Sequence, residues 1–352
     1  MKKILAILCA LSMIFALCAC GSSAPAPAPA PEAASEPAAE EAAPEAAEEA
    51  APEAVEEAAA DKVFNVGVCQ LVQHPALDKA TEGFVDALTE KLGDKVKINV
   101  QNASGDSATC ATIVGTFVSD EADLIMANAT PALQAAQAAT NKIPILGTSI
   151  TEYGVALGLD NFAGKTGINV SGTSDLAPLD GQADVLHELF PDAATVGILY
   201  CSAEANSKYQ VEAITPFLEG HGLTVNTYTF ADSNDVAAVT ATACDENDVL
   251  YIPTDNTAAN CAEAINNVAL PAGVPIICGE ENLCAGCGVA TLSISYYDIG
   301  FATGLMAFEI LANGADVSDM EIQYAPQFTK EFNAAACEAL NITVPEDYVA
   351  IG

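Results

Sequence analysis

The chain has 352 residues and a formal net charge of -37 at pH 7, because 48 Asp and Glu residues outweigh 11 Lys and Arg. A surface this acidic repels polyanions, so nucleic acid is excluded as an expected partner. All of the basic residues are Lys, and the sequence contains 0 Trp. Both facts narrow the chemistry that a binding site in this chain can use.

The first twenty residues have the pattern of a lipoprotein signal peptide with a lipobox. Lys2 and Lys3 precede an apolar stretch at 4–17, and Leu-Cys-Ala-Cys-Gly follows at 17–21. The stretch is shorter than the roughly 20 residues that cross a membrane, and its small terminal residues suit a peptidase. We therefore expect Cys20 to carry a lipid that anchors the protein to the cell membrane, outside the cytoplasm. An ordinary secretory peptide or an uncleaved anchor is the alternative.

Residues 21–61 consist almost entirely of Ala, Pro and Glu. Repeated Pro interrupts a long helix, like charges repel, and few large apolar side chains are present to offset the entropy of ordering. The composition predicts a disordered tether between the membrane and the remainder of the chain.

The remaining residues, about 62–352, exceed the size of one compact core, so we expect two lobes. Short runs rich in Val, Ile and Leu predict buried parallel strands. The runs lie at 63–69, 95–101, 124–128 and 143–147, and then at 195–200, 224–230, 249–252 and 275–278. Helical segments follow between them, at about 78–92 with Asp78 as a cap, at 209–219 and at 256–268.

This repeated alternation predicts an α/β protein made of two doubly wound βαβ lobes. We expect the first lobe to contain 62–165 and 289–319, and the second to contain 166–288 and 320–352, with a hinge of several strands. A ligand of such a fold binds outside the carboxyl ends of the strands, between the lobes.

Polar and turn-forming residues occupy these expected carboxyl ends. Each of them alone has a simpler explanation as a helix cap, and it is their convergence that predicts a ligand site. The candidate ligand-binding residues are Gln73, His74, Asn128, Ala129, Thr130, Thr148, Ser149, Asp175, Ser202, Glu204, Asn206, Ser207, Thr254, Asp255, Asn256 and Glu280.

The residue types at these ends favour an amino acid as the solute, with an aromatic or large aliphatic one as the first candidate. Because the chain has no Arg, a carboxylate must be bound by backbone N–H groups, hydroxyls and helix N-termini, as segments 128–130 and 202–207 offer. A buried ammonium group needs an acid, for which Asp255 and Asp175 are the candidates. Asp255 has the alternative of a helix cap, and Asp175 that of a turn residue. Leu71, Leu77 or a tyrosine would line the pocket for the solute's side chain.

Several longer motifs resemble the ABC-transporter substrate-binding lipoproteins associated with aromatic amino-acid (tryptophan and tyrosine) uptake. They are Q-H-P-A-L-D at 73–78, A-T-P-A at 129–132, T-S-D at 173–175, S-A-E-A-N-S at 202–207, P-T-D-N-T at 253–257 and Y-Y-D-I-G at 296–300. The resemblance implies a type I periplasmic-binding-protein fold whose hinged lobes close over a solute, and a permease and an ATPase as separate chains. Ser295 and the pair Glu280-Glu281 depart from the acidic residue and the Asp usual in that family.

Functions other than solute capture for an ABC importer have weaker support in the sequence. Cys284 and Cys287 have redox spacing, but the segment after them is strand-like, and the histidines His74, His187 and His221 lack metal spacing. We expect no enzyme activity, no cofactor, no metal, and a monomer. Three alternatives remain. The protein could present its ligand to a receptor as a sensor, it could bind a nucleoside or another small solute, or it could be an extracellular thiol oxidoreductase. The other cysteines are interpreted as small buried apolar residues at 69, 110, 201, 244, 261 and 278.

Overall fold

The computed structural model describes residues 62–351. The expected signal peptide, the lipidated Cys20 and the tether lie outside these described residues. Within 62–351, no helix combines the length and the apolar character that a membrane span requires.

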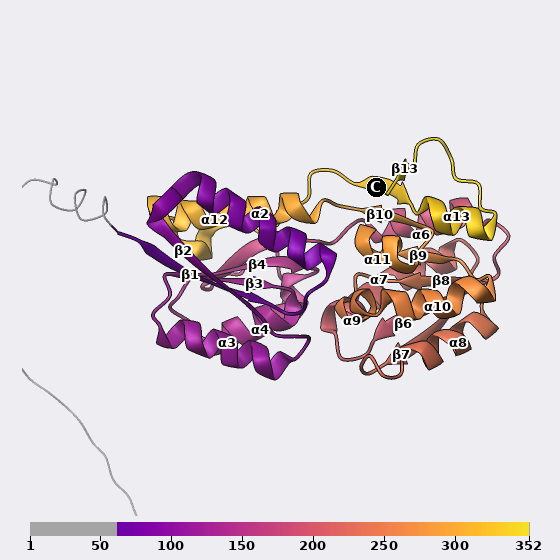
Figure 1. Cartoon of the computed structure of the whole chain (residues 1–352), viewed down its shortest axis with the longest axis horizontal. Helices are drawn as coiled ribbons and strands as arrows, with labels where there is room; N and C mark the ends of the chain where they lie inside the picture. Colours follow the sequence, from indigo (N-terminus) through magenta and orange to yellow (C-terminus); the bar gives the residue numbers. More distant parts are fainter. Residues whose placement is uncertain (1–61, 352) are drawn as a thin grey trace, which may run out of the picture. The chain divides into compact units, whose positions relative to one another are not determined.

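The first lobe is built on a six-stranded parallel sheet with the order β11-β5-β4-β3-β1-β2. Its strands are β1 (Phe64–Gln70), β2 (Val96–Asn102), β3 (Leu124–Asn128), β4 (Ile145–Ile150), β5 (Val170–Ser174) and β11 (Gln323–Tyr324). Helices α2 (Pro75–Leu92) and α12 (Tyr296–Asn313) cover one face of the sheet, and α3 (Ser107–Ser119) and α4 (Thr130–Ala139) cover the other (Figure 1). The short helix α5 (Tyr153–Leu157) follows β4, and single 3-10 turns occupy Gly93–Lys95 and Val317–Asp319.

The second lobe is built on a seven-stranded sheet with the order β13-β12-β10-β9-β8-β6-β7. Its strands are β6 (Thr195–Cys201), β7 (Thr224–Phe230), β8 (Val249–Ile252), β9 (Ile276–Cys278), β10 (Ala290–Ser293), β12 (Thr329–Phe332) and β13 (Val349–Ala350). All neighbours pair in parallel except β12, which is antiparallel to β10.

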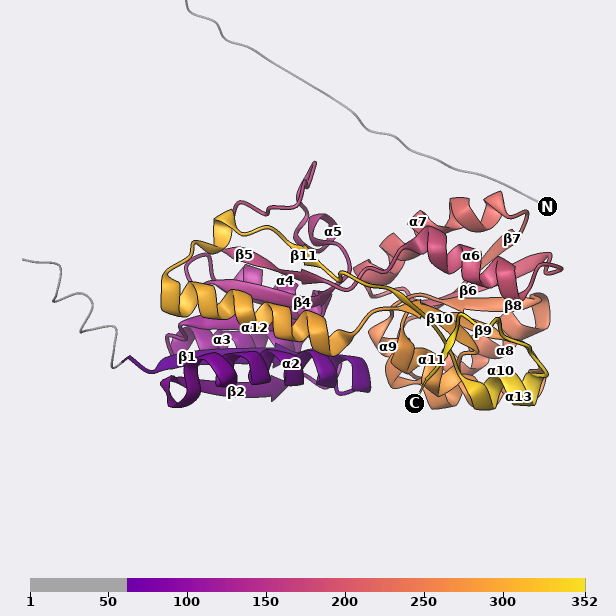
Figure 2. The same ribbon diagram turned by 90° about the horizontal axis from the view of Figure 1, so that it is seen from above.

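The helices of the second lobe lie on both faces of its sheet, as Figure 2 shows. On one face lie α6 (Leu179–Leu189) and α7 (Ala205–Gly220), and on the other lie α8 (Val236–Glu246) and α10 (Ala262–Ala272). The shorter helices are α9 (Asn256–Asn260), α11 (Glu281–Cys287) and α13 (Ala334–Leu340).

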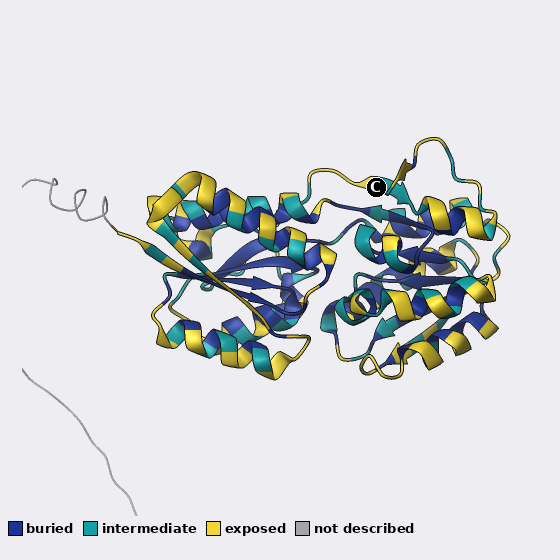
Figure 3. Cartoon of the chain, viewed as in Figure 1, coloured by how far each residue is buried: buried dark blue, intermediate teal, exposed yellow. Residues whose placement is uncertain are grey.

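Burial of the central strands between two helical layers explains their composition. All five residues of β3 and all four of β8 are buried, and the cores around them contain side chains such as Phe84, Met126, Ile198 and Tyr251. Figure 3 shows buried strands inside helices whose outer faces are exposed. The runs of Val, Ile and Leu in the sequence therefore mark real strands, with ends within about three residues of those expected.

All three expected helices differ from the structure at their ends, and the one expected at 209–219 extends over Ala205–Gly220 as α7. The first begins at Pro75, with His74 rather than Asp78 in the N-cap position, as the fixed φ of proline favours for the first helical residue. The segment expected as one helix at 256–268 is divided into α9 and α10, which meet at Cys261.

The chain passes between the two sheets three times, after β5, after β10 and after β11. Sheet pairing corrects the expected lobe boundaries in three places. β5 belongs to the first sheet because it pairs with β4, and β11 joins it by pairing with β5. β10, expected in the first lobe, pairs with β9 in the second. The sequence Val-Ser-Gly-Thr-Ser of β5 lacks the large apolar residues that would have revealed it.

Helices α2 and α12 lie side by side (Figure 1) and touch through glycines. A Cβ atom added to Gly300 would lie 2.0 Å from the carbonyl oxygen of Ala80, and one added to Gly83 would lie 2.2 Å from the carbonyl oxygen of Tyr297. Only glycine allows backbones to approach this closely. This contact holds the first turn of α12 against α2, and both helix starts contribute to the site described next.

Candidate functional site

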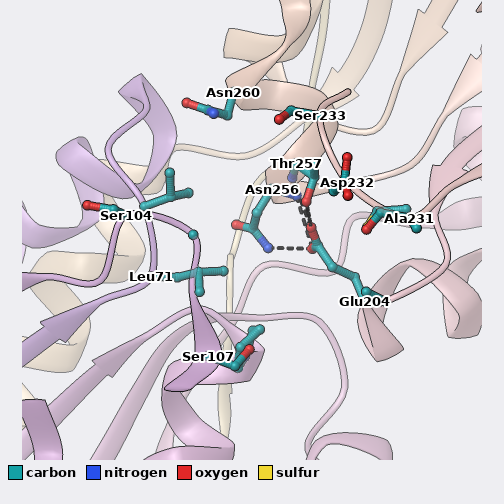
Figure 4. A pocket seen from close by; sticks show the side chains of 15 residues that line it. Leu71, Ser104, Ser107, Glu204, Ala231, Asp232, Ser233, Asn256, Thr257 and Asn260 are labelled. Atoms are coloured by element: carbon teal, nitrogen blue, oxygen red, sulfur yellow. Dashed lines mark hydrogen bonds between the residues drawn. The ribbon is translucent and has the colours of Figure 1, made fainter. Parts of the chain in front are cut away.

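A cavity of about 220 Å³ is lined by residues of both lobes. Figure 4 shows Leu71, Ser104 and Ser107 on one side of it, and Glu204, Ala231 and Asp232 on the other. Its remaining lining residues are Val72, Gly105, Pro131, Cys201, Ala203, Ser233, Asn256, Thr257 and Asn260. The location confirms that the carboxyl ends of the two sheets meet at a cavity, as ligand sites of open α/β sheets do.

The loops after the edge strands β2 and β7 were missed by the sequence analysis. They contribute Ser104, Gly105 and Ser107, and Ala231–Ser233, to the cavity wall. The sequence contains a signal for the first loop, because Asn-Ala-Ser-Gly-Asp-Ser at 102–107 is typical of a turn, and Gly105 has a φ of 82° there. Of the candidate residues named from the sequence, Glu204 and Asn256 line this cavity, and Leu71 is part of its apolar wall as expected.

Glu204 ties the start of α7 to the start of α9. Its carboxylate accepts from the side-chain and backbone nitrogens of Asn256 at 2.7 and 3.1 Å, and from the hydroxyl and backbone N–H of Thr257 at 2.7 and 2.8 Å. The Asn206 amide also donates to it, at 3.1 Å. Figure 4 shows the bonds to Asn256 and Thr257. All of these donors are protein groups, so the carboxylate of Glu204 holds the starts of α7 and α9 together and forms part of the cavity wall.

Asp255 does not present a free oxygen to a ligand, contrary to the expectation that it faces an ammonium group. One oxygen caps α9 by accepting from Ala258 N–H at 2.8 Å, and the other accepts from Cys201 N–H and Ser207 Oγ, both at 2.7 Å. Burial and, secondarily, the nearby charge of Glu204 raise the pKa of Asp255 to about 7. The alternative explanation, a helix cap, is the one that the geometry supports.

Glu280 is a second buried cap. Its carboxylate accepts from the backbone N–H groups of Asn282 and Leu283 at the start of α11. Burial raises its pKa to about 7. Glu280 therefore stabilises a helix start, and its two oxygens face the chain rather than the cavity.

Three other candidate residues are also satisfied within the fold. Thr148 Oγ1 shares a hydrogen bond with Thr173 Oγ1 at 3.1 Å, Thr254 Oγ1 donates to Gly279 O at 3.3 Å, and Ser202 Oγ donates to Phe230 O at 3.2 Å. Gln73 is exposed and lines a different hollow beside α2, and the buried Thr130 begins α4. Thr148, Thr254 and Ser202 are thus paired within the fold, whereas Gln73 and Thr130 have no side-chain hydrogen bond among residues 62–351.

Five candidate residues keep one buried side-chain atom that has no hydrogen-bond partner anywhere in residues 62–351. These atoms are His74 Nδ1, Asn128 Oδ1, Ser149 Oγ, Asp175 Oδ1 and Asn206 Oδ1. Buried polar groups in native proteins are nearly always paired. Four of the five lie at the carboxyl ends of β1, β3, β4 and β5, along one edge of the first sheet, and the fifth is on the first turn of α7. None of these five residues is among those that line the 220 Å³ cavity, so the unpaired atoms are a feature separate from its wall.

The free amide oxygens have a fixed orientation. Asn128 Nδ2 donates to Leu77 O at 2.8 Å and to Thr81 Oγ1 at 2.9 Å, and Asn206 Nδ2 donates to Glu204 and to Thr254 O at 3.2 Å. Since these partners accept, the nitrogens must face them and the oxygens must face away. Each amide thus offers an acceptor.

The backbone near these atoms adopts unusual torsion angles. Ala129 has a φ of 87° and Ser149 a φ of 56°, values that non-glycine residues rarely adopt. Residues held in such conformations cluster at ligand sites, where the surrounding fold compensates their cost. Ser149 lies at a register shift between Gly147 and Ile150 in the pairing of β4 with β5, and Ala129 is the N-cap residue of α4.

Asp175 is the buried acid with an unused oxygen. It lies directly after β5, is 4% exposed, and accepts from Tyr296 at 3.0 Å through one oxygen. Burial raises the pKa of Asp175 to about 6, and the hydrogen bond from Tyr296 works against that rise. A cation placed at the free oxygen would stabilise the ionised form.

His74 connects the two lobes. It precedes α2, and its Nε2 lies 3.4 Å from Oδ1 of Asn256 at the start of α9. Burial lowers the pKa of the imidazole, which keeps it neutral near pH 7.

A family model described as ABC transporter substrate binding protein matches residues 65–351. The chain belongs to the ABC transporter substrate-binding proteins. Members of this family are binding proteins rather than enzymes, act outside the cytoplasm and work with the components of an ABC transporter. The two-lobed α/β fold and the family predicted from the sequence are thereby confirmed.

Three similar proteins are informative. A tyrosine-binding protein of Clostridioides difficile (strain R20291) is 36% identical over 281 residues, which are 79% of this chain and 81% of the relative. An ABC domain from Streptococcus pneumonia in complex with L-Trp is 33% identical, with a TM-score of 0.77 and coverage of 81% of this chain and 97% of that one. The ligand-free, open structure of a substrate-binding protein with adhesive properties from Clostridium difficile is 37% identical, with a TM-score of 0.63 and coverage of 82% and 100%.

In this substrate-binding protein, Cys284 lies in the middle of the short helix α11 and Cys287 at its C-terminal end, and both residues are buried. The partial negative charge of a helix C-terminus disfavours a thiolate, whereas redox pairs use a helix N-terminus. Cys278 on β9 is buried close to them, and all of the cysteines in 62–351 are free thiols. This arrangement agrees with packing rather than thiol exchange.

Proposed function

We propose that this protein captures an aromatic amino acid, tyrosine or tryptophan, and delivers it to an ABC importer. The related tyrosine-binding protein and the related domain in complex with L-Trp support this class of solute. The observation that carries the proposal is the set of five unpaired polar atoms at the lobe ends.

These atoms complement the two ends of a zwitterion. Asp175, Asn128 and Asn206 each offer an acceptor oxygen, and an ammonium group donates three hydrogen bonds. Ser149 offers a hydroxyl that can donate to a carboxylate, beside backbone held at positive φ. A carboxylate bound in this way needs no guanidinium, in agreement with a chain whose 11 basic residues are all Lys.

The ammonium contact goes to Asp175 instead of Asp255. Asp175 has an oxygen to spare, whereas both oxygens of Asp255 accept from protein donors. An unpaired buried carboxylate is costly, and a ligand cation offsets that cost. Of the two acids expected from the sequence to pair with the ammonium group, we assign this role to Asp175 alone.

Calorimetric titration of the chain from residue 21 onward, with the common amino acids and nucleosides, tests the proposal. We expect L-tyrosine and L-tryptophan to bind in the micromolar range or tighter, and their decarboxylated amines to bind at least about tenfold more weakly, because the carboxylate contacts are lost. Binding of a nucleoside in place of every amino acid would overturn the proposed solute and leave the family unchanged.

Attachment to the membrane is part of the same proposal. The lipobox makes Cys20 the lipidated residue, and the Ala/Pro/Glu composition of 21–61 makes that segment the spacer. Cys20→Ser should move the protein from the membrane fraction to the soluble fraction, while deletion of 21–61 should leave solute affinity intact. Retention of Cys20→Ser on the membrane would contradict the lipid anchor, and loss of binding on deletion would contradict the spacer.

A further inference from the structure

His74 occupies the N-cap position of α2, yet its side chain makes no capping hydrogen bond. The imidazole is 7% exposed, and its Nδ1 has no partner within the described part of the chain. A buried ring nitrogen normally has a hydrogen-bond partner, so the unpaired Nδ1 is available to a group from outside the chain. Its chemistry depends on which nitrogen carries the proton.

The hydrogen-bond network determines that proton's position. Asn256 Nδ2 donates to the carboxylate of Glu204 at 2.7 Å, so Asn256 must present its oxygen to His74. An amide oxygen can only accept, which makes Nε2 of His74 the donor. A neutral imidazole has one N–H, so Nδ1 carries a lone pair and is an acceptor.

Glu204 makes this assignment firm. Its carboxylate is held by donors from Asn206, Asn256 and Thr257. Rotation of the Asn256 amide would place its oxygen against that carboxylate and leave the Nε2–H of His74 facing an N–H group. The chain of contacts from Glu204 through Asn256 therefore orients the imidazole and selects its tautomer, as the second shell of a ligand site often does.

We propose that His74 selects aromatic amino acids that carry an O–H or N–H donor on the ring, by accepting that donor at Nδ1. The inference rests on the proposed function and adds the reason for discrimination within that class. A tyrosine hydroxyl or a tryptophan indole N–H satisfies Nδ1, whereas phenylalanine leaves it buried and unpaired.

The positions of the two groups along the sheet suit such a ligand. His74 follows β1 and Asp175 follows β5, with β3 and β4 between them. The ends of β1 and β5 are three strand spacings apart, which is about 14 Å. The side chains of His74 and Asp175 shorten the gap that a ligand must span. An amino acid whose ammonium meets Asp175 can thus bring the polar part of a large ring to His74, and a short side chain cannot.

Calorimetric titration of the purified protein with two matched ligand pairs tests the proposal. The pairs are L-tyrosine with L-phenylalanine, and L-tryptophan with 1-methyl-L-tryptophan, in which a methyl group replaces the ring N–H. We expect the donor-bearing member of at least one pair to bind about tenfold or more tightly, since a site built around a buried acceptor rejects the analogue that lacks the donor. Equal affinities within both pairs would overturn the role of His74 and leave the proposed function standing, whereas failure of all four to bind would remove the proposed function itself.

Two substitutions separate the acceptor from the contact between the lobes. His74→Gln places its amide nitrogen where Nε2 lies, so it can still donate to Asn256 but loses the acceptor at Nδ1. His74→Asn places its amide near the position of Nδ1 and loses the contact with Asn256. We expect the affinity ratio within the discriminated pair to fall below about threefold in His74→Gln and to survive in His74→Asn. A ratio unchanged in His74→Gln would overturn the proposal.

Nitrogen NMR of the imidazoles provides a readout that does not depend on the variants folding. The chain contains three histidines, so the signals can be assigned with His187→Gln and His221→Gln. We expect His74 to be the Nε2–H tautomer without ligand, and its Nδ1 resonance to move on addition of tyrosine or tryptophan. An Nδ1–H tautomer, or an Nδ1 signal that the ligand does not change, would contradict the proposal.

Discussion

Tyr296 donates its hydroxyl to Asp175 at 3.0 Å across 121 residues of sequence. Asp175 directly follows β5 and Tyr296 begins α12 soon after β10, so the bond joins two of the three places where the chain passes between the sheets. It uses one carboxylate oxygen and leaves the other buried and unpaired with respect to residues 62–351. The buried acid with an unpaired oxygen is thus attached to two of the segments that join the two sheets.

Asp175→Asn should weaken the binding of a zwitterionic solute by at least about a hundredfold, because breaking a buried charge pair costs about 3 to 5 kcal/mol. The same change should leave ligand-free stability equal or higher, since burial already disfavours the charged carboxylate. Calorimetric titration and ligand-free melting measure the two effects. Asp180→Asn, at an exposed position in the first turn of α6, is the matched control. A lowered melting temperature with unchanged affinity would make Asp175 a structural residue.

Asp255→Ala should give the opposite pattern. It removes the acceptor of Ala258 N–H, Cys201 N–H and Ser207 Oγ, so we expect a loss of about 2 to 4 kcal/mol in the free energy of unfolding. Affinity for the solute should change less than about threefold, because no Asp255 oxygen is left for it. Denaturant unfolding and titration of this variant beside Asp175→Asn decide which acid binds the ammonium group.

Solute affinity should fall as the pH falls below about 6. The pKa of Asp175 in the ligand-free protein is raised to about 6 by burial, and only its ionised form pairs with an ammonium group. Each further pH unit should therefore cost up to about tenfold in affinity. Titrations between pH 7.5 and 5 should show this decline in the native protein and not in Asp175→Asn. A decline of the same size in both would assign the effect to another group.

Ligand-free stability should follow the opposite trend with pH. Burial raises the pKa of Asp255 and Glu280 to about 7 each and that of the half-buried Glu331 to about 7, above the values of an unfolded chain. A raised folded-state pKa contributes stability that is present below the unfolded pKa and lost as the pH rises through the folded pKa. The lowered pKa of His74 opposes this gain below about 6.5 with a single proton.

The melting temperature without ligand should therefore rise by a few degrees when the pH is lowered from 7.5 to 5. Glu280→Gln, which keeps an oxygen to cap α11, should show a smaller rise because one titrating carboxyl is removed. A melting temperature that falls over this range would mean that the buried carboxyls are ionised at little cost.

The sequence was a good guide where burial dictates composition. The central strands need large apolar side chains on both faces, and so β3 and β8 have the ends that were expected. It failed at β5, where Ser171 and Thr173 are buried through side-chain hydrogen bonds to Met320 and Thr303 instead. Those partners are over a hundred residues away, and no local pattern reveals them. The lobe boundaries were misplaced for the same reason.

The site was predictable in position and less so in the role of each residue. A polar residue after a parallel strand can cap the next helix or face a ligand, and the two roles use the same residue types. Asp255 and Asp175 illustrate the ambiguity, because only the distances to Ala258 N–H and to Tyr296 separate a cap from an acid with a free oxygen. The sequence alone therefore cannot distinguish a helix cap from a ligand-binding acid at these two positions.

Close packing of α2 against α12 should be the feature of the first lobe most sensitive to one methyl group. In Gly300→Ala the new Cβ would lie 2.0 Å from the carbonyl oxygen of Ala80, a backbone atom that cannot move without shifting α2. We expect a loss of at least about 2 kcal/mol and a fall of several degrees in melting temperature. Because both helices begin at the site, with His74 before one and Tyr296 in the other, solute affinity should also fall.

Gly115→Ala is the control for this substitution. Gly115 lies in the interior of α3, and a Cβ there meets no atom within 4 Å among the residues described. Alanine at that position should stabilise the protein by about 0.5 to 1 kcal/mol, because glycine loses more backbone entropy in a helix. Thermal melting and titration of the two variants therefore predict opposite signs from the same chemical change. If Gly300→Ala melts at or above the native temperature with unaltered affinity, the two helices can separate freely, and their contact does not position the site.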